Sequence, residues 1–238
     1  MTGLDRSTVR NRLLLLVDEW ESHRLIPLLE AVDLPKGFVL SHSKMPISHA
    51  YFLDSGIGSI VAESPEGQRA EAGLFGRDGF SPGALVFGSN SNSCDVLMQV
   101  GGHGYRIEAD AFQEALEEMP IFKKLLLRYV HTLTTQTSFT ALSNAVHHVD
   151  ERLARWLLMC HDRVDGDEIA LTHEFLSVML AVRRPSVTTA LHVLEGNHFI
   201  KNERGFIKIQ NRKALEEFGF DSYGKPEEEY LRLIGTMR

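Results

Sequence analysis

The chain has 238 residues, of which 43% are hydrophobic and 24% charged, and its formal net charge is −7 at pH 7. This length suits two modest domains or one large one, and the hydrophobic content is enough for ordinary buried cores. Two cysteines are too few for a disulfide framework, a zinc cluster or an iron–sulfur cluster held by four thiolates. The sequence has neither an apolar run that spans a bilayer nor a signal peptide, so we expect a cytoplasmic protein without a membrane segment.

The first third of the chain predicts helices followed by a β domain. Residues 7–20 and 22–32 predict two helices, and a Pro-Lys-Gly sequence at 35–37 ends the second. From there to residue 107, short apolar runs alternate with turns rich in glycine, serine and asparagine. Six runs have the pattern of strands, at residues 38–40, 50–53, 59–62, 70–74, 96–100 and 105–107. Strands of this length and spacing predict a β-sandwich or barrel.

A short helix over residues 109–118 and a long one from Pro120 to about residue 147 follow. Such a long helix between two domains can form the seam of a dimer. The alternative is a helix that covers the β domain of a monomer. One stripe of the long helix is apolar in its first half and partly polar in its second half. The stripe consists of Ile121, Leu125, Leu126, Tyr129, Val130, Leu133, Thr137, Thr140, Ala141 and Asn144.

Asp150 can cap the next helix, over residues 152–163, and a turn and a short strand at 168–171 lead onward. Thr172 is a natural N-cap for another short helix, because its hydroxyl can accept an amide hydrogen of the first turn. After a turn at Ala181 and Val182, a further helix starts near Arg184. Pro185 suits its first turn, and Gly196 is expected to end it as a C′ glycine.

The outer face of this last helix is polar, and such a helix fits the DNA major groove with its N-terminal residues at the base edges. Residues 199–201 and 206–209 then predict two strands around a glycine-containing turn, which form the wing of a winged helix. Residues 171–213 contain seven Lys and Arg residues and three acids, so this segment is locally basic although the chain as a whole is acidic. The pattern predicts DNA binding; a winged helix that docks another protein is the alternative.

Residues 171–195 read L-T-H-E-F-L-S-V-M-L-A-V-R-R-P-S-V-T-T-A-L-H-V-L-E, with R-L-A-R-W-L-L before them and F-I and the wing after them. This order of motifs resembles the C-terminal domain of the Crp/Fnr family of bacterial transcription regulators. The resemblance covers nearly the whole chain and implies an α+β fold. Its expected parts are a cyclic-nucleotide-binding-like jelly-roll sensor domain (1–118), a long dimerisation helix (119–148), a winged helix-turn-helix domain (149–224) and a charged tail (225–238). The implied partners are double-stranded DNA with a palindromic operator, a second copy of the chain through the long helix, and RNA polymerase.

Arg184 matches the arginine that opens the recognition helix of the family. Arginine can pair in bidentate fashion with O6 and N7 of guanine, a geometry that lysine cannot reproduce. The expected DNA-binding residues are Thr172, His173, Arg183, Arg184, Ser186, Thr188, Thr189, Lys201 and Arg204. Pro185 and Thr189 stand where many family members have a glutamate and a second arginine, so the operator should differ from that of the cyclic-AMP receptor.

The expected effector pocket departs further from the family. In nucleotide-binding relatives a glutamate holds the ribose and an Arg-Ser or Arg-Thr pair holds the cyclic phosphate; here Gly83 and Ser93 take the places of the glutamate and the arginine. A buried phosphate needs a counter-charge or several amides, and no arginine lies between Arg77 and Arg106. We therefore expect no control by cyclic AMP and no cofactor. The matching positions are Gly83, Ala84, Leu85, Ser93, Cys94, Thr137 and Ser138.

A metal-dependent, cupin-like jelly-roll enzyme with an appended helical domain is the alternative function. It requires a tight metal site in the β domain, where His42, His49 and His103 could converge. Isolated histidines on strands are more often surface or packing residues. No serine, cysteine or carboxylate constellation indicates catalysis, so we expect no metal and no enzymatic activity.

Overall fold

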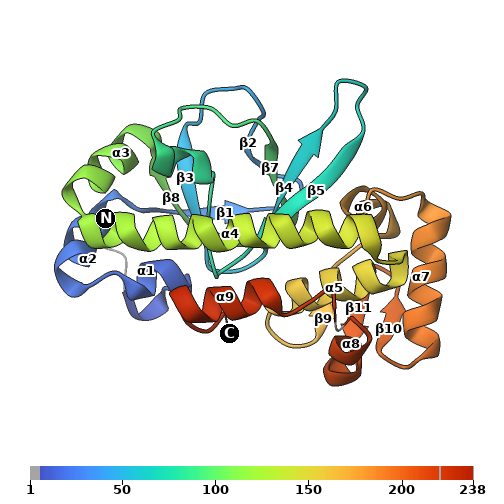
Figure 1. The fold of residues 1–238 in the computed structure, drawn as a ribbon. Helices are drawn as coiled ribbons and strands as arrows, with labels where there is room; N and C mark the ends of the chain where they lie inside the picture. Colours follow the sequence, from blue (N-terminus) through green and yellow to red (C-terminus); the bar gives the residue numbers. More distant parts are fainter. Residues whose placement is uncertain (1–5, 220, 238) are drawn as a thin grey trace.

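A computed structural model of the protein describes residues 6–219 and 221–237. Residues 1–5, 220 and 238, which belong to the predicted sensor domain, DNA-binding domain and tail, lie outside the described residues. A β roll lies on one side of a long helix, and a group of short helices with a small sheet lies at one end of that helix (Figure 1). The α+β class with a jelly roll, a long helix and a winged helix-turn-helix is confirmed.

The β roll consists of two four-stranded antiparallel sheets with strand orders β1-β8-β3-β6 and β2-β7-β4-β5. The strands are β1 (Glu30–Leu34), β2 (Val39–Ser41), β3 (His49–Leu53), β4 (Ile57–Glu63), β5 (Arg69–Phe75), β6 (Phe80–Ser81), β7 (Asp95–Val100) and β8 (Gly102–Glu108). The six predicted strands correspond to β2, β3, β4, β5, β7 and β8 and are confirmed. Strands β1 and β6, at the edges of one sheet, were not predicted.

The prediction for the N-terminal helices is wrong in two places. The single helix expected over residues 7–20 is divided because Asn11 and Asp18 each accept amide hydrogens and begin a new helix. The helix expected over residues 22–32 ends early, and its last residues belong to β1, which pairs with β8. Pro27 contributes to this early end because proline has no N–H to continue a helical ladder. The observed elements are the 3-10 helix η1 (Arg6–Thr8), α1 (Arg12–Leu16), α2 (Glu19–Leu25) and the 3-10 helix η2 (Ile26–Leu28).

Aromatic rings join the roll to the helices that follow it, α3 (Ala109–Glu118) and α4 (Pro120–Val146). Phe52 and Phe80 stack with their ring centroids 5.5 Å apart, and Phe112 and Phe122 lie against Phe52 at 6.5 and 6.1 Å. Ring pairs at such distances add stability beyond the apolar area that they bury. They fix the first half of α4 under the roll.

Helix α4 begins at Pro120 and ends one residue before the predicted end. The carboxylate of Glu21 accepts the amide hydrogens of Ile121 and Phe122, at 2.9 and 2.6 Å. Only part of the predicted stripe is buried: Leu125, Leu126, Tyr129 and Val130 are buried, while Ile121, Thr137, Ala141 and Asn144 are exposed. Among the described residues, no helix combines the length and the apolar character needed to cross a membrane.

The C-terminal part forms the winged helix-turn-helix. Its elements are α5 (Val149–His161), β9 (Glu168–Ile169), α6 (His173–Met179), α7 (Arg184–Gly196), β10 (Ile200–Glu203), β11 (Phe206–Ile209) and α8 (Arg212–Phe218), with sheet order β10-β11-β9. Asp150 does not cap α5 as predicted. His148 takes the cap position instead, and its amide donates to the Glu151 carboxylate at 2.8 Å.

The predicted tail contains an ordered helix, α9 (Lys225–Leu233), which lies along α4 in Figure 1. Tyr230 is its anchor: the side chain is buried and its hydroxyl donates to the Asp78 carbonyl at 2.7 Å. The tail therefore ties the C-terminal part of the chain back to the β roll.

One hydrophobic cluster crosses from the β roll into the C-terminal part. Ile57, Val61 and Leu74 of the roll belong to the same buried cluster as Leu153 and Leu157 of α5. The cluster continues to the inner face of α7. The roll and the winged helix of one protomer thus share a core and do not merely touch.

Candidate DNA-binding surface

Hydrogen bonds stabilise the start of α6 and the turn between α6 and α7, the two helices of the predicted motif. The Thr172 hydroxyl accepts the amide hydrogen of Phe175 at 3.4 Å, which confirms the predicted N-cap. In the turn, Ala181 has φ 49°, a left-handed conformation that a small residue tolerates better than a branched one. Arg152 of α5 donates a hydrogen bond to the Leu180 carbonyl. The turn is thereby fixed to the helix behind it.

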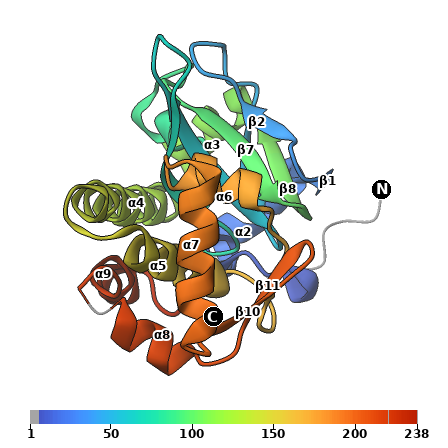
Figure 2. The same ribbon diagram turned by 90° about the vertical axis from the view of Figure 1, so that its right-hand side faces the viewer.

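Helix α7 has a buried and an exposed face, as predicted. Val187, Ala190, Leu191 and Leu194 are each at most 3% exposed. Helix α7 stands at the front of the molecule in Figure 2, beside the β10–β11 hairpin, and Arg184, Thr189 and His192 of its other face are exposed. The predicted C′ glycine is wrong: Gly196 is the last helical residue, and His198 adopts the left-handed conformation with φ 58°.

The predicted DNA-binding residues lie at the start of α6, in the first half of α7 and in the β10–β11 hairpin. Arg183 occupies the N-cap position of α7 without a capping hydrogen bond from its side chain, and Arg184 is the first residue of the helix. The side chains fall into an exposed group (Thr172, Arg183, Arg184, Thr189, Lys201, Arg204) and a half-exposed group (His173, Ser186, Thr188). None of the nine predicted residues is buried. Their contact with DNA stays a prediction.

Two threonines of α7 have restricted hydrogen-bonding roles. Thr188 Oγ1 donates to the Arg184 carbonyl at 3.2 Å, and Thr189 Oγ1 donates to the Pro185 carbonyl at 3.1 Å. With its hydrogen used inside the helix, each hydroxyl keeps its lone pairs for an incoming donor. In the major groove such donors are the amino groups of cytosine and adenine.

Two residues of this surface were missing from the predicted set. His192 is exposed on α7, three residues after Thr189 and four after Thr188; its helical spacing was the signal for including it. Glu174 is the other: its Oε1 lies 2.7 Å from Nη2 of Arg184. The sequence signal for Glu174 was its place in the first turn of α6, next to the predicted DNA-binding residues Thr172 and His173.

The wing is a short hairpin that turns at Gly205, whose φ of 90° requires glycine. Lys201 is paired with Glu203 at 2.7 Å, while Arg204 has no acidic side chain within 4 Å among the described residues. His173 of α6 lies 3.4 Å from the Asn202 amide of the wing. The structure therefore brings the first turn of α6 and the wing together.

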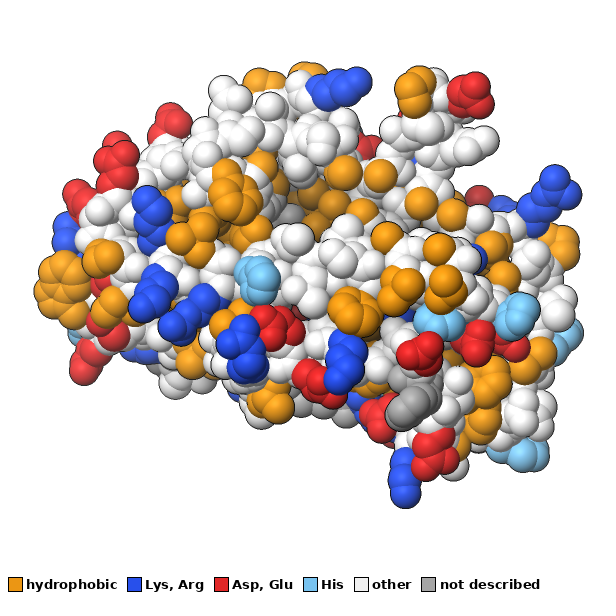
Figure 3. Space-filling view, in the orientation of Figure 1, with side chains coloured by type: hydrophobic (Ala, Val, Ile, Leu, Met, Phe, Trp, Pro, Cys, Tyr) orange, Lys and Arg blue, Asp and Glu red, His pale blue; other side chains and the backbone are white. Residues whose placement is uncertain are grey.

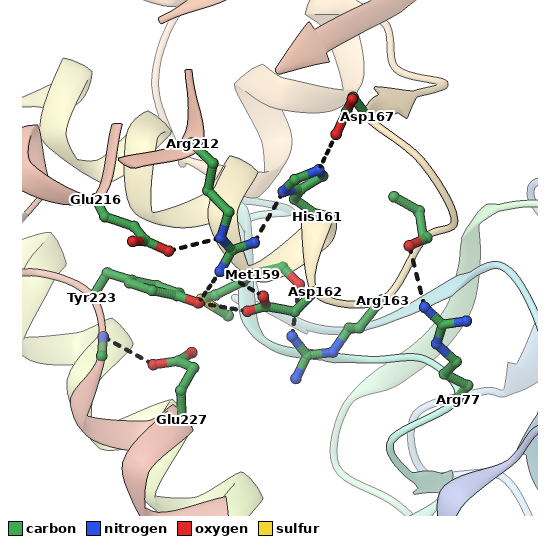
Figure 4. Close-up of polar contacts among 12 residues, drawn as sticks. Arg77, Met159, His161, Asp162, Arg163, Asp167, Arg212, Glu216, Tyr223 and Glu227 are labelled. Carbon is green, nitrogen blue, oxygen red and sulfur yellow. Dashed lines mark hydrogen bonds and ion pairs between the residues drawn. The ribbon is translucent and has the colours of Figure 1, made fainter. Parts of the chain in front are cut away.

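A polar junction, drawn in Figure 4, holds α8 and the end of the wing against α5. Arg212 donates to Asp162 at 2.8 Å, to the Tyr223 hydroxyl at 2.8 Å and to Glu216 at 2.7 Å. The Nη1 atom of Arg212 lies 2.9 Å from Nδ1 of His161. Because arginine only donates, this nitrogen accepts, and Nε2 carries the proton toward Asp167 at 3.0 Å.

Ionic contacts attach the winged helix to the β roll. Arg163 Nε and Nη2 donate to the two carboxylate oxygens of Asp78, at 3.0 and 2.7 Å, and both side chains are buried. Asp165 accepts from Arg10 and from Arg77, whose hydrogen bonds hold the pKa of its carboxyl well below the usual range. The orientation of the winged helix on its own roll is set by these bonds together with the shared core.

A third contact contains a buried carboxyl group, Glu71 of β5. Trp156 Nε1 of α5 donates to Glu71 Oε1 at 2.7 Å, and Ser59 Oγ lies 2.6 Å from Oε2. Burial raises the pKa of Glu71 to about 7, against the opposing effect of these two hydrogen bonds. A carboxyl group that titrates near neutral pH therefore lies between the roll and α5.

Of the residues of the expected effector pocket, Gly83, Ala84 and Leu85 form the start of the short 3-10 helix η3 (Gly83–Phe87), and Thr137 and Ser138 lie on α4. Leu85 is buried, and its carbonyl accepts a hydrogen bond from Gln113. Ser93 is exposed and Cys94 half-buried. Thr137 and Ser138 donate to the Leu133 and Thr134 carbonyls of their own helix.

Helix α4 packs closely on β5 in this region. Gln136 bonds to both the amide and the carbonyl of Leu74, at 2.8 and 3.1 Å. A Cβ added at Gly73 would lie 3.0 Å from Gln136 Oε1 and 3.3 Å from Leu133 Cδ1. Residues 78–105 contain no lysine or arginine that could face a phosphate. An effector pocket formed by these residues stays a prediction.

The three histidines of the alternative enzyme hypothesis lie apart. His42 lies 3.9 Å from Asp95, His103 bonds to Ser55, and His49 lies at the opposite end of the β3–β8 pair from His103. Within residues 6–219 and 221–237, no group of three or more His, Cys, Asp or Glu side chains could hold a metal ion. The metal-dependent hypothesis has no site in this part of the chain.

Residues 151–218 match the model of the Crp-like helix-turn-helix domain. Solved structures of similar fold include a transcriptional regulator of the Crp/Fnr family from Eubacterium rectale (18% identity, 87% of this chain and 97% of that one, TM-score 0.67). A second example is FixK2 from Bradyrhizobium japonicum, with 13% identity over 80% of this chain and 96% of that one and a TM-score of 0.68. A third is the c-di-GMP responsive global regulator CLP of Xanthomonas campestris, with 16% identity over 81% of this chain and 99% of that one and a TM-score of 0.64.

Curated relatives include uncharacterised NTE family proteins of Mycobacterium bovis and Mycobacterium tuberculosis. They are 28% identical over 133 residues, which are 56% of this chain but 22% of the length of those proteins. The chain therefore spans a small part of these longer relatives.

Proposed function

We propose that the chain is a DNA-binding transcription regulator of the Crp/Fnr family and acts as a homodimer on a two-fold symmetric operator, since residues 151–218 match the Crp-like helix-turn-helix domain and the fold is that of Crp/Fnr regulators. The observation that carries the proposal is the outward face of α7: it is polar, uncovered and begins with Arg184. A helix of this kind reads base edges from the major groove, and a two-fold dimer reads two half-sites. RNA polymerase as partner, action in the cytoplasm and the lack of a catalytic role are parts of the same proposal.

The long helix α4 supplies the proposed dimer seam over residues 119–148. One side of α4 is free of the β roll and of α9, and hydrophobic side chains gather along it and on the roll above it (Figure 3). Leu127, Leu142 and Val146 of α4 are 40%, 48% and 63% exposed. Exposed apolar patches of this kind mark interaction sites, and a second copy would cover this one.

We further propose that cyclic AMP does not control the protein. The region around η3 offers no lysine or arginine for a cyclic phosphate, and Gln136 fills the contact between α4 and β5. An effector of other chemistry, or none, would then set its activity.

Selection of bound sequences from a random pool of duplex DNA, at fixed salt and without cyclic AMP, tests the DNA proposal. We expect enrichment of a two-fold symmetric site that added cyclic AMP leaves unchanged. Arg184→Ala should lose about 1–3 kcal/mol of binding free energy on that site, because a bidentate arginine–guanine pair discriminates bases by that amount. An unchanged affinity and unchanged base preference of the variant would remove Arg184 from the contact set.

Leu142→Glu tests the dimer seam. A carboxylate buried against a partner helix has no counter-charge, so dimerisation should weaken about tenfold or more, and operator binding should weaken with it. Sedimentation velocity over a range of concentrations measures the first effect. Leu231→Glu is the matched control, since Leu231 is 58% exposed on α9 and should stay dimeric. A Leu142→Glu protein that remains a dimer would place the seam elsewhere.

A further inference from the structure

The foremost DNA-contact candidate has an acidic partner on the neighbouring helix. Arg184 in the first turn of α7 is paired with Glu174 in the first turn of α6, with Nη2 and Oε1 2.7 Å apart. Both side chains are open to solvent, at 61% and 73% exposure. By contrast, Arg183 and Arg204 have no acidic side chain within 4 Å among the described residues. Lys201 of the wing is also paired, with Glu203 at 2.7 Å, so among the three predicted DNA-binding arginines the pairing is particular to the one expected to read a base.

Stability does not explain this pair, because ion pairs between two exposed side chains contribute little to folding. Affinity for the DNA backbone does not explain it either. Glu174 lies in the first turn of α6, two residues after Thr172 and in contact with Arg184, which are both predicted DNA contacts, and a carboxylate at such a surface repels phosphates. A surface that served only to attract DNA would be better without this acid.

Orientation of the guanidinium does explain it. Arginine carries five N–H donors in a planar fork. A carboxylate that binds one edge of the guanidinium fixes its orientation and leaves the donors of another edge free to bind DNA. A guanidinium held in this way is ready for O6 and N7 of guanine, whereas a free one also bonds to phosphates. In addition, a carboxylate at a base edge can accept from the amino group of cytosine.

We propose that Glu174 is a specificity-determining residue, which positions Arg184 for guanine and lowers affinity for DNA that lacks the site. This inference rests on the proposed DNA-binding function. It assigns to an acidic residue of the first helix a role in base selection.

Glu174→Gln is the decisive variant, and Glu203→Gln is its matched control. Glu203 is also an acid of the DNA-facing side, paired with a base at 2.7 Å, but on the wing. Each change removes one negative charge, so both should strengthen binding to scrambled duplex. Only Glu174→Gln should lower the ratio of operator to scrambled affinity, by about tenfold. The ratio is measured by titration of labelled duplexes at one salt concentration.

The same substitution in an Arg184→Ala background separates positioning from a general charge effect. If Glu174 acts through Arg184, Glu174→Gln should leave the affinity ratio of that background unchanged. Equal effects of Glu174→Gln and Glu203→Gln in the wild-type background would overturn the inference while leaving DNA binding intact. A wild-type protein that enriches no sequence would overturn the proposed function and this inference with it.

Discussion

Arg163→Met should lower the free energy of unfolding by about 3–5 kcal/mol. The substitution leaves Asp78 ionised, buried and without its partner, since its carboxylate is 2% exposed and receives both guanidinium hydrogen bonds. An uncompensated buried charge is far more costly than the loss of the pair itself. Urea unfolding followed by circular dichroism measures the change.

Two further variants serve as controls for the stability change of Arg163→Met. Asp78→Asn combined with Arg163→Met removes both charges and keeps a side-chain acceptor for the Gly76 amide, which Asp78 binds at 2.7 Å. It should recover much of the lost stability. Lys213→Met breaks an exposed pair with Glu217 and should change stability by about 0.5 kcal/mol or less. A loss no larger for Arg163→Met than for Lys213→Met would contradict the account of the buried pair.

Glu71→Gln should remove a pH dependence of stability worth about 3 kcal/mol. The pKa of Glu71 is about 7 in the folded protein, against an ordinary value of 4.5. The folded state therefore holds the proton more tightly, and its stabilising effect is fully present below pH 4.5. As pH rises toward and through 7, the unfolded chain ionises first and this stability is lost.

The measurement is the difference in unfolding free energy between wild type and variant at several pH values from 5 to 8. That difference should shift in favour of Glu71→Gln as the pH rises, because the amide cannot ionise. Glu66→Gln, in the exposed turn between β4 and β5, is the control and should follow the wild-type curve. Parallel curves for wild type and Glu71→Gln would show that Glu71 ionises normally in the fold.

The recognition motif was predictable because its signals are local. Thr172 caps a helix three residues before the amide that it accepts, and the buried residues of α7 recur at steps of three and four. The long helix could be delimited in the same way, from Pro120 to the end of its pattern. Its faces could not, because the roll and α9 both cover parts of it.

The errors have physical causes as well. Residues 30–32 of strand β1 were predicted as helix because only Leu34 of the five strand residues is buried, so no alternation shows in the sequence. The pairs Asp78–Arg163 and Glu71–Trp156 each join residues 85 positions apart. No spacing rule connects such residues, since the fold alone brings them together. Glu174 could have been included, because it lies in the first turn of α6 beside residues that were predicted.

The hydrophobic cluster that runs from Ile57 and Leu74 through α5 to α7 has a mechanical consequence. The buried apolar contacts of this cluster across α5 oppose rotation of the winged helix relative to the β roll of the same protomer. In the proposed dimer, the distance between the two recognition helices then depends chiefly on the angle at which the two α4 helices cross. A ligand or a mutation that changes that one angle would change which half-site spacing the protein can span.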